Sequence, residues 1–449
     1  MAISAPAQTN RSQRLDSLPF TKEHRKVLVG SGLGWALDAM DVGLISFVLA
    51  QLAVQWKATS LELSLIASSG FVGMAIGAAL GGLLADRLGR RHVFAVTLLV
   101  YGLATGASAL AGTVAVLIAL RFVVGLGLGA ELPVASTLVS EFAPPRIRGR
   151  IIVILESFWA VGWTAAAVIG YLVVPYSADG WRWALVIGAV PALYSVVVRL
   201  RLPESVRFLE GRGRFAEAEA TVRRFEASAG RTRDTAAAGG TQIAPDATVA
   251  VRPRVAELLS ARYRTRTAAL WLVWFCVNFS YYGAFIWLPT ILVASGFSLI
   301  RSFEYTLIIT LAQLPGYAVS AWLIEKWGRQ RTLAAFLVGS AVSAGFFGLA
   351  GDVTQVIVAG MLLSFFNLGA WGALYAVTPE LYPTRMRATG AGWAAGVGRI
   401  ASILAPLAVP FLRDAGGNTA LFGVFAAFFV VAALSSFWLP ERRGAALED

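Results

Sequence analysis

Charged side chains are scarce in this 449-residue sequence: only 14% of its residues are Asp, Glu, Lys or Arg, whereas 57% are hydrophobic. Water-soluble domains carry roughly a quarter charged residues, so this composition excludes an ordinary soluble protein. Apolar stretches of roughly 20 residues recur along the whole chain, and each is long enough to cross about 30 Å of hydrocarbon as a helix. The short alternating segments of membrane-spanning β-strands are missing. The sequence therefore predicts an all-α membrane protein.

We expect about twelve spans. The polar residues 1–26 lack the apolar core and cleavage site of a signal peptide, so a retained cytoplasmic tail is expected. The long polar segment 202–266 predicts a cytoplasmic connection, with an amphipathic helix as far as about Phe225 and a disordered stretch over 230–250. A second cytoplasmic tail is expected over 440–449. The approximate limits of the spans are 27–55, 61–84, 92–112, 114–139, 151–174, 181–201, 267–295, 302–325, 332–350, 354–378, 388–411 and 418–439.

Residues that bind metals or react with substrates are also rare. The single cysteine, Cys276, falls inside a predicted span and excludes an intrachain disulfide. Only two histidines, His24 and His92, are present, both near predicted membrane edges, which argues against a transition-metal site. No Walker loop and no nucleophile–base pair can be recognised. We therefore expect no cofactor, no ATP-driven process and no enzymatic activity.

The net charge of +12 follows the predicted topology. Of the 38 Lys and Arg residues, all but six fall on the side of the two termini. This asymmetry is the positive-inside pattern, which places both termini in the cytoplasm. The basic charge is thus interpreted as a sign of orientation, and no nucleic-acid partner is expected. The six exceptions are Lys57, Arg121, Arg182, Arg301, Arg399 and Arg413.

Two turn motifs recur at one offset. Asp86 and Glu325 occupy corresponding positions 239 residues apart, and so do Glu141 and Glu380. The pair Pro203-Glu204 recurs 237 residues later as Pro440-Glu441. Because the motifs keep their order and spacing, the sequence predicts two six-helix halves in parallel orientation, 27–201 and 267–439.

These turn motifs resemble those of the major facilitator superfamily. The run Gly82-x-Leu-Ala-Asp-Arg-x-Gly-Arg-Arg91 matches its inter-helix signature nearly fully, and Arg121-x-x-x-Gly-x-Gly-x-Gly129 matches a second one. The Glu/Arg pairs and the two Pro-Glu motifs are similar to those of sugar porters and organic ion transporters. The runs 35–43, 129–136 and 155–163 resemble the family of bacterial niacin transporters. This resemblance covers essentially the whole chain and implies a twelve-helix carrier of the bacterial inner membrane, expected to be a monomer.

Charged residues at the inner ends of the even-numbered spans form a predicted gating network. Acidic and basic groups at these ends could form ion pairs between the two bundles and hold the inner side closed. The alternative is that these charges only set topology. The residues are Asp86, Arg87, Arg90, Arg91, Glu141, Arg148, Glu204, Arg207, Glu325, Arg329, Glu380, Arg387 and Glu441.

Four acidic residues inside spans are candidates for proton coupling, because an intramembrane charge usually faces a cavity or a partner. Asp38 and Asp41 are three residues apart on one helix face, and two close carboxylates disfavour each other's ionisation. Glu131 and Glu156 are further candidate protonation sites, although a structural hydrogen bond is the preferred interpretation for Glu156. By depth, Arg121 is expected to pair with Asp38 or Asp41; the alternative is a static ion pair between helices.

Arg399 and a set of aromatic and amide side chains are candidates for substrate binding. The region around Arg399 resembles organic-anion carriers, and this resemblance implies that its guanidinium selects a carboxylate; a bond to backbone carbonyls is the alternative. Stacking on aromatic rings would suit a flat ligand, although each ring alone is as compatible with lipid contact or core packing. With Arg121, the other candidates are Trp159, Trp163, Asn278, Tyr281, Tyr282, Gln313, Trp371 and Tyr375.

Together with the resemblance, these patterns favour a secondary transporter that works by alternating access, with proton-coupled uptake of a small organic acid such as nicotinate or a related aromatic compound. A sugar or an organic cation is the alternative cargo, and competition assays would separate the three. A receptor or a channel is a more remote alternative, since no output domain or selectivity filter can be recognised.

Overall fold

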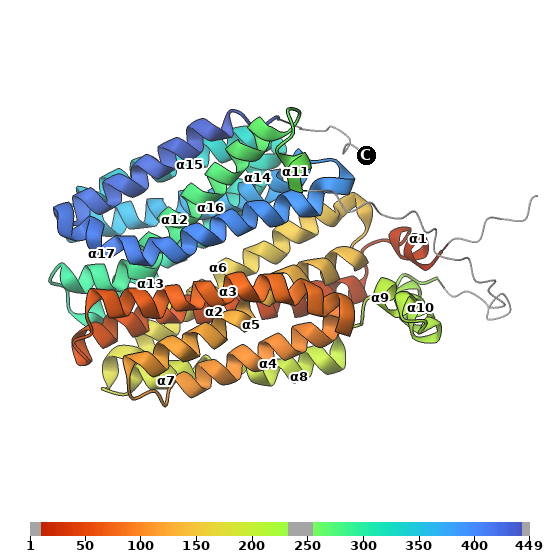
Figure 1. Cartoon of the computed structure of the whole chain (residues 1–449), viewed down its shortest axis with the longest axis horizontal. Helices are drawn as coiled ribbons and strands as arrows, with labels where there is room; N and C mark the ends of the chain where they lie inside the picture. Colours follow the sequence, from red (N-terminus) through yellow and green to blue (C-terminus); the bar gives the residue numbers. More distant parts are fainter. Residues whose placement is uncertain (1–9, 232–254, 442–449) are drawn as a thin grey trace, which may run out of the picture.

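The computed structural model describes residues 10–231 and 255–441, and within these ranges it is helical without a β-strand. Most helices run side by side along the long axis of the molecule (Figure 1). In that view α2 to α8 form a lower group and α12 to α17 an upper group. Three short helices, α1, α9 and α10, project at one end, which we call the near end; the opposite end is the far end.

The lower group begins after the short helix α1. Thr59 caps α3 by accepting a hydrogen bond from the amide of Glu62, and the Glu62 carboxylate accepts one from the amide of Thr59. Pro191 lies in the first turn of α8 and divides the predicted span 181–201 into two helices. The helices are α1 (Arg11–Asp16), α2 (Lys22–Gln55), α3 (Ser60–Leu88), α4 (Arg90–Ser108), α5 (Val114–Phe142), α6 (Arg148–Val173), α7 (Gly180–Ile187) and α8 (Val190–Arg201).

The upper group follows the connection between the halves. Its predicted span 302–325 is likewise broken, at Ala312, into two helices. The last helix contains two crossings, because the backbone leaves helical geometry at Gly416 and Gly417, and Gly417 has a φ of 66° that favours glycine. The helices are α12 (Arg264–Ala294), α13 (Leu299–Leu311), α14 (Gln313–Trp327), α15 (Arg329–Gly348), α16 (Val353–Val377) and α17 (Thr384–Ser436).

These helices account for all twelve predicted spans when α7 with α8 and α13 with α14 each count as one crossing. Ten helical segments of the described chain are long and apolar enough to cross a membrane, by length and composition. One of the ten is α17, which crosses twice, and α4 is the crossing outside that set; it begins with Arg90, Arg91 and His92. The predicted twelve-helix, all-α membrane fold is confirmed.

Close packing inside the lower group depends on glycine. A Cβ atom at Gly129 of α5 would lie 2.0 Å from the carbonyl oxygen of Met74 on α3, and one at Gly73 would lie 2.2 Å from that of Phe122. No side chain fits these distances, so α3 and α5 approach backbone to backbone.

The two groups of helices contact each other toward the far end. Ser64 Oγ and Ser68 Oγ of α3 donate to the carbonyl oxygens of Pro406 and Ile403 of α17, at 2.8 and 2.9 Å. Phe47 of α2 packs edge-on against Phe303 of α13, with ring centroids 5.0 Å apart. By contrast, no ion pair between described side chains joins the lower group to the upper group. The far end is therefore the closed end.

The connection between the groups begins with α9 (Val206–Gly211) and α10 (Phe215–Ser228), and a short α11 (Val255–Leu258) precedes α12. Arg14 of α1 bonds Glu219 and Glu226 of α10, at 2.9 and 2.7 Å. Partial burial raises the pKa of Glu219, but hydrogen bonds from Arg14, Arg223 and Arg11 outweigh it and lower that pKa to about 2. This ionic cluster holds α1 against α10. Most of the stretch predicted to be disordered, along with the ends of both tails, lies outside the described residues.

Candidate functional site

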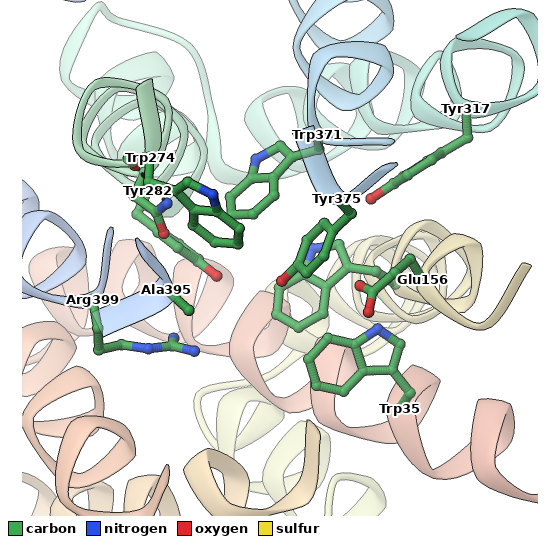
Figure 2. A pocket seen from close by; sticks show the side chains of 11 residues that line it. Trp35, Glu156, Trp274, Tyr282, Tyr317, Trp371, Tyr375, Ala395 and Arg399 are labelled. Atoms are coloured by element: carbon green, nitrogen blue, oxygen red, sulfur yellow. Dashed lines mark hydrogen bonds between the residues drawn. The ribbon is translucent and has the colours of Figure 1, made fainter. Parts of the chain in front are cut away.

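A cavity lies between the two groups of helices, and both contribute to its lining (Figure 2). It contains about 490 Å³ of space between atoms, and this figure includes the part open to solvent. Three lining residues come from the lower group and eight from the upper. They are Trp35, Glu156 and Trp159, with Trp274, Asn278, Tyr282, Tyr317, Trp371, Tyr375, Ala395 and Arg399.

Six of the predicted binding residues line this cavity, and Glu156 joins them. The other predicted residues, Arg121, Trp163, Tyr281 and Gln313, lie outside the lining. Four further lining residues were not among the predicted site residues: Trp35, Trp274, Tyr317 and Ala395. Each stands three or four residues from a named candidate on the same helix, so one-turn spacing was the signal that could have found them.

Arg399 supplies positive charge at one side of the cavity (Figure 2). It comes from α17, and its Nη1 atom lies 3.6 Å from the sulfur of Met74 across the boundary between the groups. Among the described residues no carboxylate lies within 4.0 Å of this guanidinium. A guanidinium without a counter-ion in a partly buried site is suited to bind an anionic ligand in two-point geometry.

Glu156 supplies a carboxyl group on the side opposite Arg399 (Figure 2). It comes from α6, has 3% of its surface exposed, and forms no ion pair with a described residue. The indole nitrogen of Trp35 points toward its carboxyl group, and Tyr317 and Tyr375 flank the same side. The cavity thus has a cationic end and a carboxyl end that are not bonded to each other.

Aromatic rings form the walls between these ends. Trp371 and Tyr375 of α16 are stacked, with ring centroids 5.6 Å apart and planes tilted by 23°. Trp35 and Trp159 are in contact, with centroids 5.0 Å apart and planes tilted by 43°. The indole N–H of Trp159 donates to the hydroxyl of Tyr281 at 3.1 Å, which fixes that ring across the boundary between the groups. Such walls suit a flat, apolar ring system.

Three of the predicted binding residues, Asn278, Trp163 and Gln313, differ in how their side chains are held. Asn278 donates to the carbonyl oxygen of Trp274 at 2.7 Å and accepts from Ser402 at 3.1 Å, so its amide is largely satisfied. Trp163 packs edge-on against Tyr281. Gln313 is fully buried, and its amide has no hydrogen-bond partner in the described part of the chain.

Arg121 and Asp41 form a buried ion pair on the lower side. Arg121 Nη1 lies 2.9 Å from Asp41 Oδ2, and Thr105 donates to Asp41 Oδ1 at 2.5 Å. Of the two partners that the sequence allowed for Arg121, the structure therefore pairs it with Asp41. Neither residue lines the cavity.

Asp38 instead adjoins Glu131 of α5. The two carboxyl groups lie against each other and beside the hydroxyl of Tyr101, and both residues are buried, with 1% and 0% exposure. Gly34 makes room for this contact, since a Cβ atom there would lie 2.6 Å from Glu131 Oε1. None of the four carboxyl oxygens has a hydrogen-bond partner of ordinary geometry in the described structure.

The predicted gating residues cluster at the near end in two equivalent arrangements. Glu204 accepts from the amide of Arg91 and Glu441 from the amide of Arg329, both at 3.2 Å, next to Gly89 and Gly328. The ion pairs found among the described side chains stay within one group or join it to α1; ion pairs between the two groups were expected. In the lower group, Arg90 bonds Asp86 at 2.9 Å and lies 3.7 Å from Glu141, and Arg148 bonds Asp16 of α1 at 3.1 Å. In the upper group, Arg329 bonds Glu380 at 3.2 Å, and Arg387 donates to the carbonyl oxygen of Pro379. The remaining predicted residues, Arg87, Arg207 and Glu325, are exposed.

The whole chain is similar to known membrane transporters. Residues 20–449 match the family described as "Sugar (and other) transporter". The niacin transporter NiaP of Acinetobacter baylyi is 48% identical over 439 residues, which are 97% of this chain and 98% of that protein. The putative niacin/nicotinamide transporter NiaP of Bacillus subtilis is 48% identical over 385 residues, covering 86% and 88% of the two chains.

A solved structure has the same fold. The xylose transporter XylE from E. coli, in a partially occluded inward open conformation, superimposes with a TM-score of 0.76 at 19% sequence identity. The superposition covers 95% of this chain and 100% of the transporter. This similarity extends the shared architecture over both groups of helices.

Proposed function

The chain belongs to the sugar (and other) transporter family of the major facilitator superfamily and is a multi-pass membrane transporter of small molecules, and we propose that it carries nicotinate or a closely related pyridine carboxylate together with protons. It is not an enzyme. Two relatives named for niacin transport, each 48% identical, support this cargo. The cavity supports it independently, because its shape and charge suit a small aromatic acid.

The observation that carries the proposal is the guanidinium of Arg399, which has no counter-ion among the described residues and lines a cavity with aromatic walls. We propose that a flat heteroaromatic ring lies between the Trp35–Trp159 pair and the Trp371–Tyr375 stack, which both line the cavity. Its carboxylate then reaches Arg399, which offers two parallel N–H donors. A sugar has no flat aromatic ring that could stack on these side chains. An organic cation would be repelled by the positive charge of Arg399.

The proposed cycle is alternating access by two rigid halves. The halves, 27–201 and 267–439, contribute opposite walls of the cavity and are connected by the segment 202–266. They contact each other at the far end, while ion pairs at the near end stay inside each half. The structure is therefore interpreted as open toward the near end, which is the cytoplasmic side if both termini are cytoplasmic. We further propose that the chain works as a monomer in the bacterial inner membrane.

Proton coupling is assigned to Asp38 and Glu131. Asp41 is balanced by Arg121, whereas Asp38 and Glu131 face each other without a cation among the described residues. Two adjacent carboxylates away from water disfavour simultaneous ionisation, so at least one holds a proton in this state. Trp35 lines the cavity and stands one turn before Asp38 on α2. The carboxyl pair therefore lies one helix turn from the proposed substrate site.

Uptake of labelled nicotinate into proteoliposomes tests the proposal. The purified chain should accumulate nicotinate when a pH gradient, acidic outside, is imposed, and excess unlabelled nicotinate should compete while xylose and choline should not. Arg399→Gln should lower the apparent affinity at least about tenfold, since a charged hydrogen bond to the ligand is lost. Arg301→Gln, a change at an exposed arginine outside the cavity, is the matched control. Competition by xylose or choline instead of nicotinate would contradict the proposal.

A further inference from the structure

We infer that Glu156 recognises the ring nitrogen of the substrate by sharing one proton with it, while Arg399 holds the carboxylate. The inference rests on the proposed function, because it assigns the second end of the same cavity. It identifies the substrate class more closely: an aromatic ring with an anionic group on one side and a basic nitrogen on another. Figure 2 shows the two residues on opposite sides of the space between the aromatic rings.

Glu156 differs from the other buried acids of the described chain by its position. Asp38, Asp41 and Glu131 do not line the cavity, whereas Glu156 does. It pairs with no described cation, and its neighbours on that side are the indole of Trp35 and the phenols of Tyr317 and Tyr375. These groups carry one polar atom each and no charge. The carboxyl group of Glu156 is therefore available for a ligand.

A pyridine nitrogen is a natural partner for such a carboxyl group. If the proton is on Glu156, its O–H donates to the neutral ring nitrogen; if the proton is on the ring, the pyridinium N–H donates to the carboxylate. One proton lies between the two groups in both cases, and no bond other than this hydrogen bond forms or breaks. Without the ligand, an ionised Glu156 would be a buried charge without a counter-ion, which is costly.

The arrangement predicts which analogues the cavity rejects. Benzoate retains the carboxylate for Arg399 but lacks the ring nitrogen, so it leaves the buried Glu156 without its partner. Nicotinamide retains the nitrogen but offers no charge to Arg399. Discrimination between nicotinate and benzoate should therefore depend on Glu156, and discrimination between nicotinate and nicotinamide on Arg399.

Equilibrium binding to the purified full-length protein in detergent tests this assignment. The dissociation constants of nicotinate and benzoate are measured for the natural chain and for Glu156→Leu and Glu156→Gln. We expect the natural chain to prefer nicotinate about tenfold or more, and Glu156→Leu to bring this ratio close to one. Glu217→Gln, an exposed change on α10, is the control and should leave the ratio unchanged.

Glu156→Gln separates recognition from a merely structural role. The glutamine amide still donates to a neutral ring nitrogen but cannot titrate, so the preference for nicotinate should persist while the pH dependence that the shared proton gives the natural chain disappears. If Glu156→Leu does not fold, this pH profile alone decides. A ratio unchanged in Glu156→Leu, or a pH profile unchanged in Glu156→Gln, would overturn the inference. A natural chain that binds no nicotinate would instead refute the proposed function.

Discussion

Arg121 Nη1 lies 2.9 Å from Asp41 Oδ2, and both side chains are buried inside the lower group of helices. One turn earlier on the same helix, Asp38 adjoins Glu131 and faces no cation among the described residues. A single turn of α2 therefore carries one balanced and one unbalanced carboxyl group. On this difference we propose a structural role for Asp41 and a proton-binding role for Asp38.

The ion pair of Asp41 should stabilise the fold only while both partners are present. Replacing Asp41 with Asn leaves a buried guanidinium without a counter-ion, and we expect a loss of about 3–5 kcal/mol in unfolding free energy. The double variant Asp41→Asn/Arg121→Gln should be more stable than Asp41→Asn alone, because no buried charge remains. Thermal unfolding of the purified variants measures this order, with the exposed Asp86→Asn as control. Equal stability of the single and double variants would exclude the charge argument.

Substitutions in the carboxyl pair of Asp38 and Glu131 should affect transport and not the stability of the fold. Asp38→Asn and Glu131→Gln each remove a group that is difficult to ionise, so neither is expected to lower the thermal unfolding temperature. Both should abolish accumulation driven by a pH gradient, while exchange of labelled for unlabelled substrate at equal pH continues. Parallel measurement of the two transport modes distinguishes loss of coupling from loss of binding. Gradient-driven accumulation that survives in both variants would remove the pair from the coupling mechanism.

The sequence predicts the helices well and their mutual contacts only in part. The spans can be predicted from hydropathy because a helix that crosses the membrane needs a long apolar stretch. The helix breaks at Pro191 and Ala312 do not interrupt these apolar stretches, so hydropathy does not reveal the breaks. The partner of Asp38 could not be predicted, because its contact with Glu131 depends on how closely α2 approaches α5 at Gly34.

The expected ion pairs between the halves show a different limit of sequence analysis. Glu141 and Glu380 lie near arginines of their own halves, Arg90 and Arg329. A carrier that alternates between states makes different contacts in each, and the charge pattern of the sequence does not specify which state a structure adopts.

Gly89 should be intolerant of any side chain. Its φ of 98° and ψ of 150° lie in a region that glycine alone adopts readily, and an added Cβ atom would lie 2.5 Å from Glu204 Oε2. We expect Gly89→Ala to cost about 1–3 kcal/mol and to displace Glu204 from the amide of Arg91. Gly82→Ala is the matched control in the preceding helix, where an added Cβ meets no atom within 4 Å. Unfolding midpoints of the two variants should differ, and equal midpoints would refute the steric argument.

Docking of α1 on α10 should weaken in acid. The pKa of Glu219 is lowered to about 2 in the folded chain, from an ordinary value of 4.5. A lowered folded pKa means that the contact is fully present above about pH 4.5 and is lost progressively as the pH falls toward 2. Spin labels at Ser12→Cys and Ala220→Cys should therefore report a longer mean distance at pH 3 than at pH 6. Glu219→Gln should lengthen it already at pH 6, whereas Glu217→Gln should not, and a distance independent of pH would contradict the ionic clamp.

The far end should open when its hydrogen bonds are removed. Ser68 donates across the boundary to Ile403, and its loss removes a contact that exists only while the halves meet there. A hydrogen bond contributes roughly 0.5–1.5 kcal/mol, so Ser68→Ala should shift the balance of states about two- to tenfold toward opening at the far end.

Thr290 near the far end of α12 is only 7% exposed, and in a Cys276→Ala background Thr290→Cys gives a single reporter thiol. Its labelling by an impermeant maleimide should rise in Ser68→Ala and stay constant in Ser157→Ala, whose hydroxyl bonds only its own helix. Unchanged labelling in Ser68→Ala would mean that this hydrogen bond does not hold the far end shut. The closed end would then depend on the hydrogen bond of Ser64 to Pro406 and on the aromatic contact of Phe47 with Phe303.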